Sequence, residues 1–321
     1  MNLVRYRRWL FLLSALLVVP SLVALLIPPS LRPGIDFTGG SALTVEFEQA
    51  VTTQQVIDAL DPIGHGDAIV QGVGGATFFI RTKELEPEVV DASGAVLRDS
   101  GRVILEATLT ELAPLRVTAV DTVSAVVGAE NVRNAIFAVA AASAAILLYV
   151  TWAFRRVPNP FRYGTAAIIA LVHDVVVVLG VFSLLGKFAN VEVNAMFITG
   201  VLTVIGYSVN DTIVVFDRLR ENVARHHAAP FIDVVNLSVR ETIGRSLNTS
   251  LTLLVVVAAL LMFGGPSIQP LLLVLLVGVV IGAYSSIFVA TLLLVSWETG
   301  ELGRALTRLN PFGGRRQAPA A

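Results

Sequence analysis

The chain has 321 residues, of which 55% are hydrophobic and 15% are charged, and its formal net charge is −1. This composition excludes an ordinary soluble protein, and the absence of cysteine excludes disulfides, thiolate chemistry and cysteine-ligated metals. Residues 33–131 hold 15 of the 24 acidic residues against five basic ones, and the basic residues cluster elsewhere in the chain, so no nucleic-acid partner is expected.

Six apolar stretches are long enough to cross a lipid bilayer as helices, which takes about 20 residues each. They lie near residues 9–27, 133–153, 163–185, 194–216, 245–263 and 270–297. The first has an apolar core of 19 residues and no small-residue cleavage pattern after it, so we expect a retained signal anchor. The sequence therefore predicts a polytopic α-helical membrane protein with six transmembrane helices.

The arginines of the loops predict how these helices are oriented, because cytoplasmic loops are enriched in Lys and Arg. The loops on one side carry almost all of them, and the short loops on the other side carry only Lys187. The arginines are Arg5, Arg7, Arg8, Arg155, Arg156, Arg162, Arg218, Arg220, Arg225, Arg240, Arg304, Arg308, Arg315 and Arg316. Both termini are therefore expected in the cytoplasm, and the acidic segment 33–131 outside.

Segment 33–131 has the pattern of one small α+β domain. Strands are expected at 41–47, 68–71, 77–81 and 115–120, and helices at 51–60 and, in parts, at 84–112. This order, β-α-β-β-α-β, is that of a ferredoxin-like unit. The glycines of segment 34–40 indicate a sharp turn into the domain. The full prediction is 1–32 for the N-terminus and first helix, 33–131 for the extracytoplasmic ferredoxin-like α+β domain, 132–298 for a five-helix bundle and 299–321 for a cytoplasmic tail.

A polar run interrupts the fourth apolar stretch and contains Asp211. A carboxylate at membrane depth costs about 2.5–3.5 kcal/mol on insertion scales and usually marks a pathway or a relay. Counting along the helices places Arg245 of the fifth stretch at a similar depth. Because arginine keeps its charge, Asp211 is the group that would titrate, and the two residues together suggest proton coupling. The alternative is a permanent buried salt bridge that only locks the helices.

Other polar residues of these spans are candidates for the same site. Asn210 is expected to assist Asp211, and a polar pocket of Ser208, Asn248 and Thr249 would hold water or fix side chains. In the third span, His173 and Asp174 lie near the midplane. They would form either a relay, since histidine titrates near neutrality, or a packing contact with the partner subunit or with the hydroxyls of the fourth helix. No spacing supports a metal site or a cofactor, and no nucleophile–base arrangement suggests an enzyme.

The glycines of the fourth and sixth spans and the loop 217–244 lead to two structural predictions. The Gly278–Gly282 spacing predicts close helix contact, and Gly200 and Gly206 are expected to let backbones approach. The loop 217–244 is basic with apolar residues between, so short helices lying on the membrane are expected there.

Four segments have distinctive sequences: GIDFTGG at 34–40, GYSVNDTIVVFDRLREN at 206–222, NLSVRETIGRSLNTS at 236–250 and GVVIGAYSS at 278–286. Together they resemble the SecF family of translocase subunits. The resemblance covers residues from about 5 to 298. One departure is Ser246, where the family usually has threonine, and the insert at 90–102 is also unusual.

The resemblance implies a subunit of the Sec preprotein translocase, related to RND transporters, in the bacterial inner membrane. Its implied partners are a SecD-like subunit, the SecYEG channel, the translocating preprotein and protons, and its implied role is to use the proton motive force in translocation. Two alternatives stay open at this point: an RND-like antiporter of small molecules and protons, and a passive scaffold of the translocase.

Overall fold

The computed structural model describes residues 3–301 apart from 91–95, 156, 158 and 266–267. The chain divides into two compact units, and each is described by itself. One unit is Pro33–Phe137, and the other joins Met1–Arg32 to the segment that starts at Ala138. The predicted tail 299–321 lies almost wholly outside the described residues.

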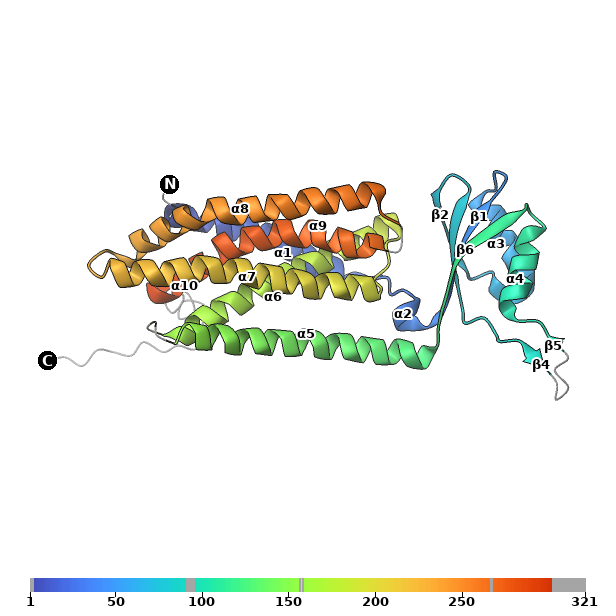
Figure 1. The fold of residues 1–321 in the computed structure, drawn as a ribbon, viewed down its shortest axis with the longest axis horizontal. Helices are drawn as coiled ribbons and strands as arrows, with labels where there is room; N and C mark the ends of the chain where they lie inside the picture. Colours follow the sequence, from blue (N-terminus) through green and yellow to red (C-terminus); the bar gives the residue numbers. More distant parts are fainter. Residues whose placement is uncertain (1–2, 91–95, 156, 158, 266–267, 302–321) are drawn as a thin grey trace. The chain divides into compact units, whose positions relative to one another are not determined.

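The Pro33–Phe137 unit is built on a four-stranded antiparallel sheet with the order β2-β3-β1-β6. The strands are β1 (Gly40–Phe47), β2 (Ile69–Gly74), β3 (Thr77–Thr82) and β6 (Leu115–Val123). Helices α3 (Thr53–Leu60) and α4 (Gly101–Thr110) pack on one face of this sheet (Figure 1). The predicted ferredoxin-like arrangement is confirmed.

The core of this unit includes the apolar residues that alternate along β1. Leu43, Val45 and Phe47 point to the helices and are almost fully buried. The facing apolar residues of the two helices complete the core: Val56, Leu60, Leu105 and Leu109. Thr52 caps α3, since its hydroxyl accepts from the Gln55 amide at 3.3 Å while the Gln55 side chain accepts from the Thr52 amide at 2.9 Å.

Of the segment 84–112, which was predicted to be helical in parts, α4 is helical and the stretch before it is not. Backbone pairing of β4 (Val89–Val90) with β5 (Val96–Arg98) forms a small hairpin there. The helix begins only after Ser100, whose hydroxyl accepts from the Val103 amide at 3.3 Å. Pro87 favours an extended residue before it, which opposes helix in this region. The middle of the unusual insert, 91–95, lies outside the described residues.

The glycine turn at the start of the unit follows from close backbone approach. After the short helix α2 (Ile35–Thr38), Gly39 and Gly40 have φ of 75° and 125°. A Cβ on Gly39 would lie 2.8 Å from the backbone of Ala125, and one on Gly40 would lie 2.6 Å from the carbonyl of Thr82. Only glycine fits both positions, which confirms the predicted turn.

Six helical segments of the described chain are long and apolar enough to cross a membrane. They are α1 (Arg7–Leu26) with a short 3-10 turn before it, α5 (Ala125–Ala153), α6 (Pro160–Ala189), α7 (Ala195–Arg225), α8 (Phe231–Phe263), and a last segment made of α9 (Gln269–Tyr284), a π-helical turn (Ser285–Ala290) and α10 (Thr291–Glu298). In the helical unit α1, α6, α7, α8 and α9 run side by side (Figure 1). The six predicted spans are confirmed.

Short helices on the membrane surface were wrongly predicted for 217–244. Instead α7 continues to Arg225 and α8 starts at Phe231, so a tight turn joins two long helices. Apolar residues on both extensions explain this, because Leu219 of α7 and Val234 and Val239 of α8 are buried in one core. Their packing stabilises helical structure beyond the ends of the apolar stretches.

The predicted close helix contact is confirmed for three of the four glycines. A Cβ on Gly278 would lie 2.3 Å from the Val204 side chain, and one on Gly282 would lie 3.2 Å from Ser208. Gly200 lies similarly close to Val274. Gly206 differs, since a Cβ there would meet nothing within 4 Å. Glycines therefore bring α7 against α9, which places the polar residues of both helices in one interior.

Candidate functional site

Asp211 lies on α7 in the interior of the helical unit and is 5% exposed. Ser246 of α8 donates a hydrogen bond from Oγ to Asp211 Oδ1 at 2.6 Å. The other carboxylate oxygen, Oδ2, is buried and has no hydrogen-bond partner among the described residues. Asp211 lies about 24 Å along α7 from Ala195, at 1.5 Å per residue. The result is a deep carboxylate with one oxygen satisfied and one oxygen available to hold a proton.

Arg245 does not pair with Asp211 in this structure, contrary to the interpretation of the sequence. Its side chain is exposed, and the neighbouring Ser246 is the residue that α8 turns toward Asp211. Successive helix residues point about 100° apart, so one of these neighbours faces inward while the other faces out. Counting residues gave the depth of Arg245 but not its direction around the helix. Its part in proton coupling stays a prediction.

Three further predicted site residues also lie on outer faces of the helices. Asn210 is exposed on α7, and Asn248 and Thr249 are exposed on α8. The Thr249 hydroxyl donates to the carbonyls of Arg245 and Ser246 within its own helix, at 3.1 and 2.9 Å. The predicted polar pocket of Ser208, Asn248 and Thr249 is therefore not formed, and Asn210 does not face Asp211. Of its members only Ser208 is buried.

A second buried acid, Asp174 of α6, is the residue that Ser208 contacts. Asp174 is 1% exposed, and its Oδ2 accepts hydrogen bonds from Ser208 Oγ at 2.6 Å and from Ser285 Oγ at 2.7 Å. Its Oδ1 lies 3.0 Å from Nδ1 of His173, which is also buried. His173 Nε2 has no hydrogen-bond partner among the described residues. Asp174 thus joins α6, α7 and the π-helical turn.

Hydroxyl groups extend this contact along α7 toward Asp211. Ser286 donates to the backbone carbonyl of Ser208 at 2.9 Å, and Thr212 donates to Ser286 Oγ at 2.9 Å. The π-helical turn widens the last helix at this point, a feature that is frequent at functional sites. Polar contact is therefore continuous from Asp174 to the residue that follows Asp211.

Ser246 and Thr212 were not among the predicted site residues. The signal that could have found them is spacing, since Ser208 and Thr212 lie four residues apart on one face of α7. Ser246 and Ser250 repeat this spacing on α8, and Ser250 Oγ lies 2.8 Å from the Tyr207 hydroxyl. Hydroxyls at i and i+4 in an apolar helix mark the face turned toward another helix.

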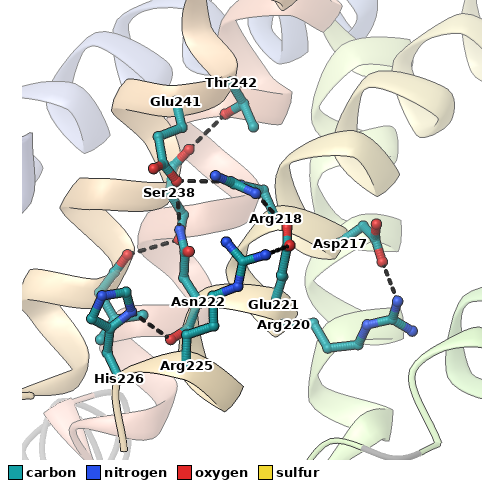
Figure 2. Close-up of polar contacts among 11 residues, drawn as sticks. Asp217, Arg218, Arg220, Glu221, Asn222, Arg225, His226, Ser238, Glu241 and Thr242 are labelled. Atoms are coloured by element: carbon teal, nitrogen blue, oxygen red, sulfur yellow. Dashed lines mark hydrogen bonds and ion pairs between the residues drawn. The ribbon is translucent and has the colours of Figure 1, made fainter.

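A charged cluster ties α7 to α8 near the turn that joins them (Figure 2). Arg218 Nε donates to Glu241 Oε2 at 2.8 Å, and Asn222 Nδ2 donates to the same oxygen at 2.7 Å. Asn222 also donates to Ser238 Oγ at 3.1 Å. Arg218 further pairs with Glu221 on its own helix. This cluster sets the lateral contact of the two helices that meet at Asp211.

Two family models match the chain. One is described as protein export membrane protein SecD/SecF, C-terminal, and matches residues 104–300, and the other is the SecD/SecF GG motif at residues 31–51. The protein translocase subunit SecF of Thermobaculum terrenum is 43% identical over 97% of this chain and 98% of its own length. The chain belongs to the SecF family. The SecF of Anaerolinea thermophila is 37% identical over 94% of this chain and 95% of its own length.

Solved structures of SecDF share the fold. The crystal structure of SecDF from Thermus thermophilus, titled a translocon-associated membrane protein, matches with a TM-score of 0.78 and 33% identity over 93% of this chain. A SecDF in a super-membrane-facing form matches with a TM-score of 0.63 and 31% identity over 96% of this chain. This chain covers 39% and 40% of those two SecDF chains, so it matches only part of each of them.

Proposed function

We propose that this SecF-family chain is a subunit of the Sec preprotein translocase that uses the proton motive force, together with a SecD-like partner, to promote passage of preproteins through SecYEG. The observation that carries the proposal is the state of Asp211, a deeply buried carboxylate with one oxygen bonded to Ser246 and the other without a partner. Its role is transport rather than catalysis of a chemical reaction.

Protonation of Asp211 would change the contact between α7 and α8. As a carboxylate, Asp211 only accepts hydrogen bonds, and the Ser246 hydroxyl donates to it. Once protonated it carries a donor of its own and no charge, so the same pair can reverse its hydrogen bond and the cost of burying a charge disappears. Gain and loss of one proton would therefore favour different arrangements of these helices, which is the coupling that the proposal needs.

Exposed polar residues on α7 and α8 support a partner subunit on that side. Asn210 of α7 and Arg245 and Asn248 of α8 are exposed within apolar spans. An arginine facing lipid at the centre of a bilayer costs about 2.5–3.5 kcal/mol on insertion scales, and such residues normally face protein or water. We propose that these side chains face the SecD-like partner, and that Arg245 turns toward Asp211 when α7 and α8 move.

The proposed setting is the inner membrane of a bacterium, with both termini in the cytoplasm. The loop arginines support this orientation, which puts the Pro33–Phe137 unit outside and the α7–α8 turn inside. Asp211 would then lie nearer the cytoplasmic face, since it is about 24 Å along α7 from its outer end. Protons would reach it from the outer side through the translocase complex.

The experiment that tests the function replaces this chain by its variants in cells that lack their own copy and follows export of a reporter preprotein. Asp211→Asn keeps the size of the side chain and removes its titration, and we expect it to slow export as much as deletion does. Asp217→Asn is the matched control, because Asp217 is exposed and, among the residues that the structure describes, pairs only with Arg220 on the same helix. Normal export with Asp211→Asn in an assembled complex would favour a passive scaffold.

A second experiment tests the position of the partner. The chain has no cysteine, so a single introduced cysteine can be cross-linked without background. Asn248→Cys on α8 should form a cross-link to the SecD-like partner, whereas Leu148→Cys on the apolar outer face of α5 should not. A cross-link from Leu148→Cys alone would place the partner on the other side of the bundle.

A further inference from the structure

His173 and Asp174 form a buried pair in the middle of α6 that the coupling at Asp211 does not use. His173 is 8% exposed and Asp174 is 1% exposed. They lie about 21 Å from the start of α6 at Pro160 and about 22 Å from its end at Ala189, at 1.5 Å per residue. A charged or titratable group at that depth is costly and is a functional-site hypothesis by default.

The hydrogen bonds around Asp174 fit a carboxylate. Ser208 and Ser285 place two hydroxyls within 2.7 Å of Oδ2, and His173 Nδ1 lies 3.0 Å from Oδ1. A hydroxyl donates one hydrogen, and the imidazole Nδ1 reaches Oδ1 as a donor when it carries its hydrogen. A carboxylate can accept all three of these hydrogen bonds at once. The pair then carries a charge of −1 while His173 is neutral.

His173 Nε2 is the atom of this pair that can take a proton. With Nδ1 donating to Asp174, the neutral imidazole has its lone pair on Nε2, which is buried and has no partner among the described residues. A proton added to Nε2 makes the ring an imidazolium and leaves Asp174 ionised, so the charge of the pair goes from −1 to 0. Uptake of a proton from the gradient therefore removes a net buried charge, and no bond to another group has to break.

The groups that face this pair do not supply another counter-charge. Elements α1, α7, α9, α10 and the π-helical turn pack against α6. Tyr284 of α9 has its ring centroid 6.2 Å from that of His173, and its hydroxyl contacts Ser14 of α1. The titratable groups of α7 near this height are Asp211 and Tyr207, whose hydroxyl contacts Ser250 of α8. Glu298 of α10 pairs with Arg162 at the start of α6. Segments 9–27 and 285–290 carry no titratable side chain.

We propose that His173 and Asp174 form a second proton-binding site of this chain, in which Nε2 of His173 takes the proton and Asp174 holds the resulting charge. The inference rests on the proposed use of the proton gradient and adds a site to it. Protonation reaches α7 through Ser208, because a carboxylate neutralised by its imidazolium holds the two serine hydroxyls less strongly. Ser208 lies one helical turn before Asp211, so the two sites act on the same segment of α7.

Solid-state nitrogen NMR of the full-length chain in lipid vesicles tests the site directly. The chain has four histidines, His65, His173, His226 and His227, so histidine labelled with nitrogen-15 gives a small set of signals. Comparison with His173→Asn assigns the signals of His173. We expect these to change from those of a neutral ring protonated at Nδ1 to those of an imidazolium between about pH 8 and 5. A ring that stays neutral across this range overturns the proposal.

Export by the assembled translocase separates proton binding from a structural role. In His173→Asn, the amide nitrogen can still donate to Asp174 where Nδ1 did, but the equivalent of Nε2 is gone. We expect this variant to lose the gradient-dependent part of export, while His227→Asn, an exposed histidine near the α7–α8 turn, keeps it. If His173→Asn exports like His227→Asn, the pair only holds the helices together, and the proposal is wrong.

The outcome at Asp211 keeps this proposal distinct from the proposed function. Loss of gradient-dependent export in Asp211→Asn with retention in His173→Asn overturns the second site alone. Retention in Asp211→Asn overturns the proposed function, whereas the NMR result still decides whether His173 binds a proton. If His173→Asn fails to assemble, the spectra of the unmodified chain decide the question by themselves.

Discussion

Ser246 of α8 donates to Asp211 of α7 across 2.6 Å, and this is the one hydrogen bond of the described residues that reaches the Asp211 side chain. The neighbouring Arg245 points away from it. The acid of the helical unit is therefore held by a neutral hydroxyl rather than by a fixed counter-charge. A carboxylate in this state can exchange a proton without first breaking a buried ion pair, which would cost several kcal/mol.

Replacing Ser246 tests the importance of this hydroxyl. Ser246→Ala leaves Asp211 without its donor, and loss of a hydrogen bond to a charged group costs about 1.5–3 kcal/mol. We expect strongly reduced gradient-dependent export at normal levels of assembled complex. Ser246→Thr keeps a hydroxyl at the same position and should retain export. Equal export by both variants would show that the hydroxyl does not matter.

Gly278 tests the close approach of α9 to α7. A Cβ there would lie 2.3 Å from Val204, so Gly278→Ala should overpack the interface and destabilise the protein by about 1–3 kcal/mol. Gly244→Ala is the control, since a Cβ at Gly244 meets nothing within 4 Å and alanine favours helix by about 0.5–1 kcal/mol. Thermal unfolding of the purified chain in detergent measures both. A stabilised Gly278→Ala would contradict the packing described.

The Arg218–Glu241 pair should contribute little to stability despite its good geometry. Its side chains are 31% and 32% exposed, and exposed pairs typically contribute about 0.2–1 kcal/mol. A double-mutant cycle with Arg218→Gln and Glu241→Gln measures the coupling, because glutamine keeps an oxygen for Asn222. We expect a small coupling free energy that falls as salt is added. A coupling of several kcal/mol would mean that the pair is effectively buried.

The Pro33–Phe137 unit should lose stability in acid through His65. Burial, and second the charge of Lys83, hold the pKa of His65 below its usual value of 6.5, although Asp67 opposes them. The unfolded chain therefore binds the proton more readily, so stability is complete above about pH 6.5 and falls as the pH drops toward the folded pKa. Amide exchange in β2 and β3 of the full chain, corrected for intrinsic rates, should show this loss. His65→Gln should flatten it, and an equal pH dependence in both chains would rule out His65 as the cause.

Much of the fold could be predicted, because the spacing of apolar residues and the length of apolar stretches can be read directly from the sequence. Alternation at Leu43, Val45 and Phe47 marked β1, and six apolar windows marked the six helices. The ends of α7 and α8 could not be predicted, because tertiary packing at Leu219 and Val239 extends helix past the apolar windows. The hairpin of β4 and β5 was missed for a related reason, since it depends on backbone pairing between two short segments.

The candidate site could be predicted only in part. Depth along a helix follows from counting residues, so Asp211 and Asp174 were correctly placed inside apolar spans. Direction around a helix depends on which neighbours it packs against, and this turned Ser246 inward and Arg245 outward. The serine ligands of Asp174 could not be paired from sequence, because Ser208 and Ser285 come from helices far apart in the chain.

In the proposed function, titration of Asp211 couples the proton gradient to export. The most direct measurement follows preprotein transport into inverted membrane vesicles, with the gradient imposed and then collapsed by an uncoupler, for the unmodified chain and for Asp211→Asn. We expect the gradient to stimulate transport with the unmodified chain and with the Asp217→Asn control. Asp211→Asn should remove this stimulation and leave the rate without a gradient unchanged. Stimulation of the same size with Asp211→Asn would rule out Asp211 as the coupling group.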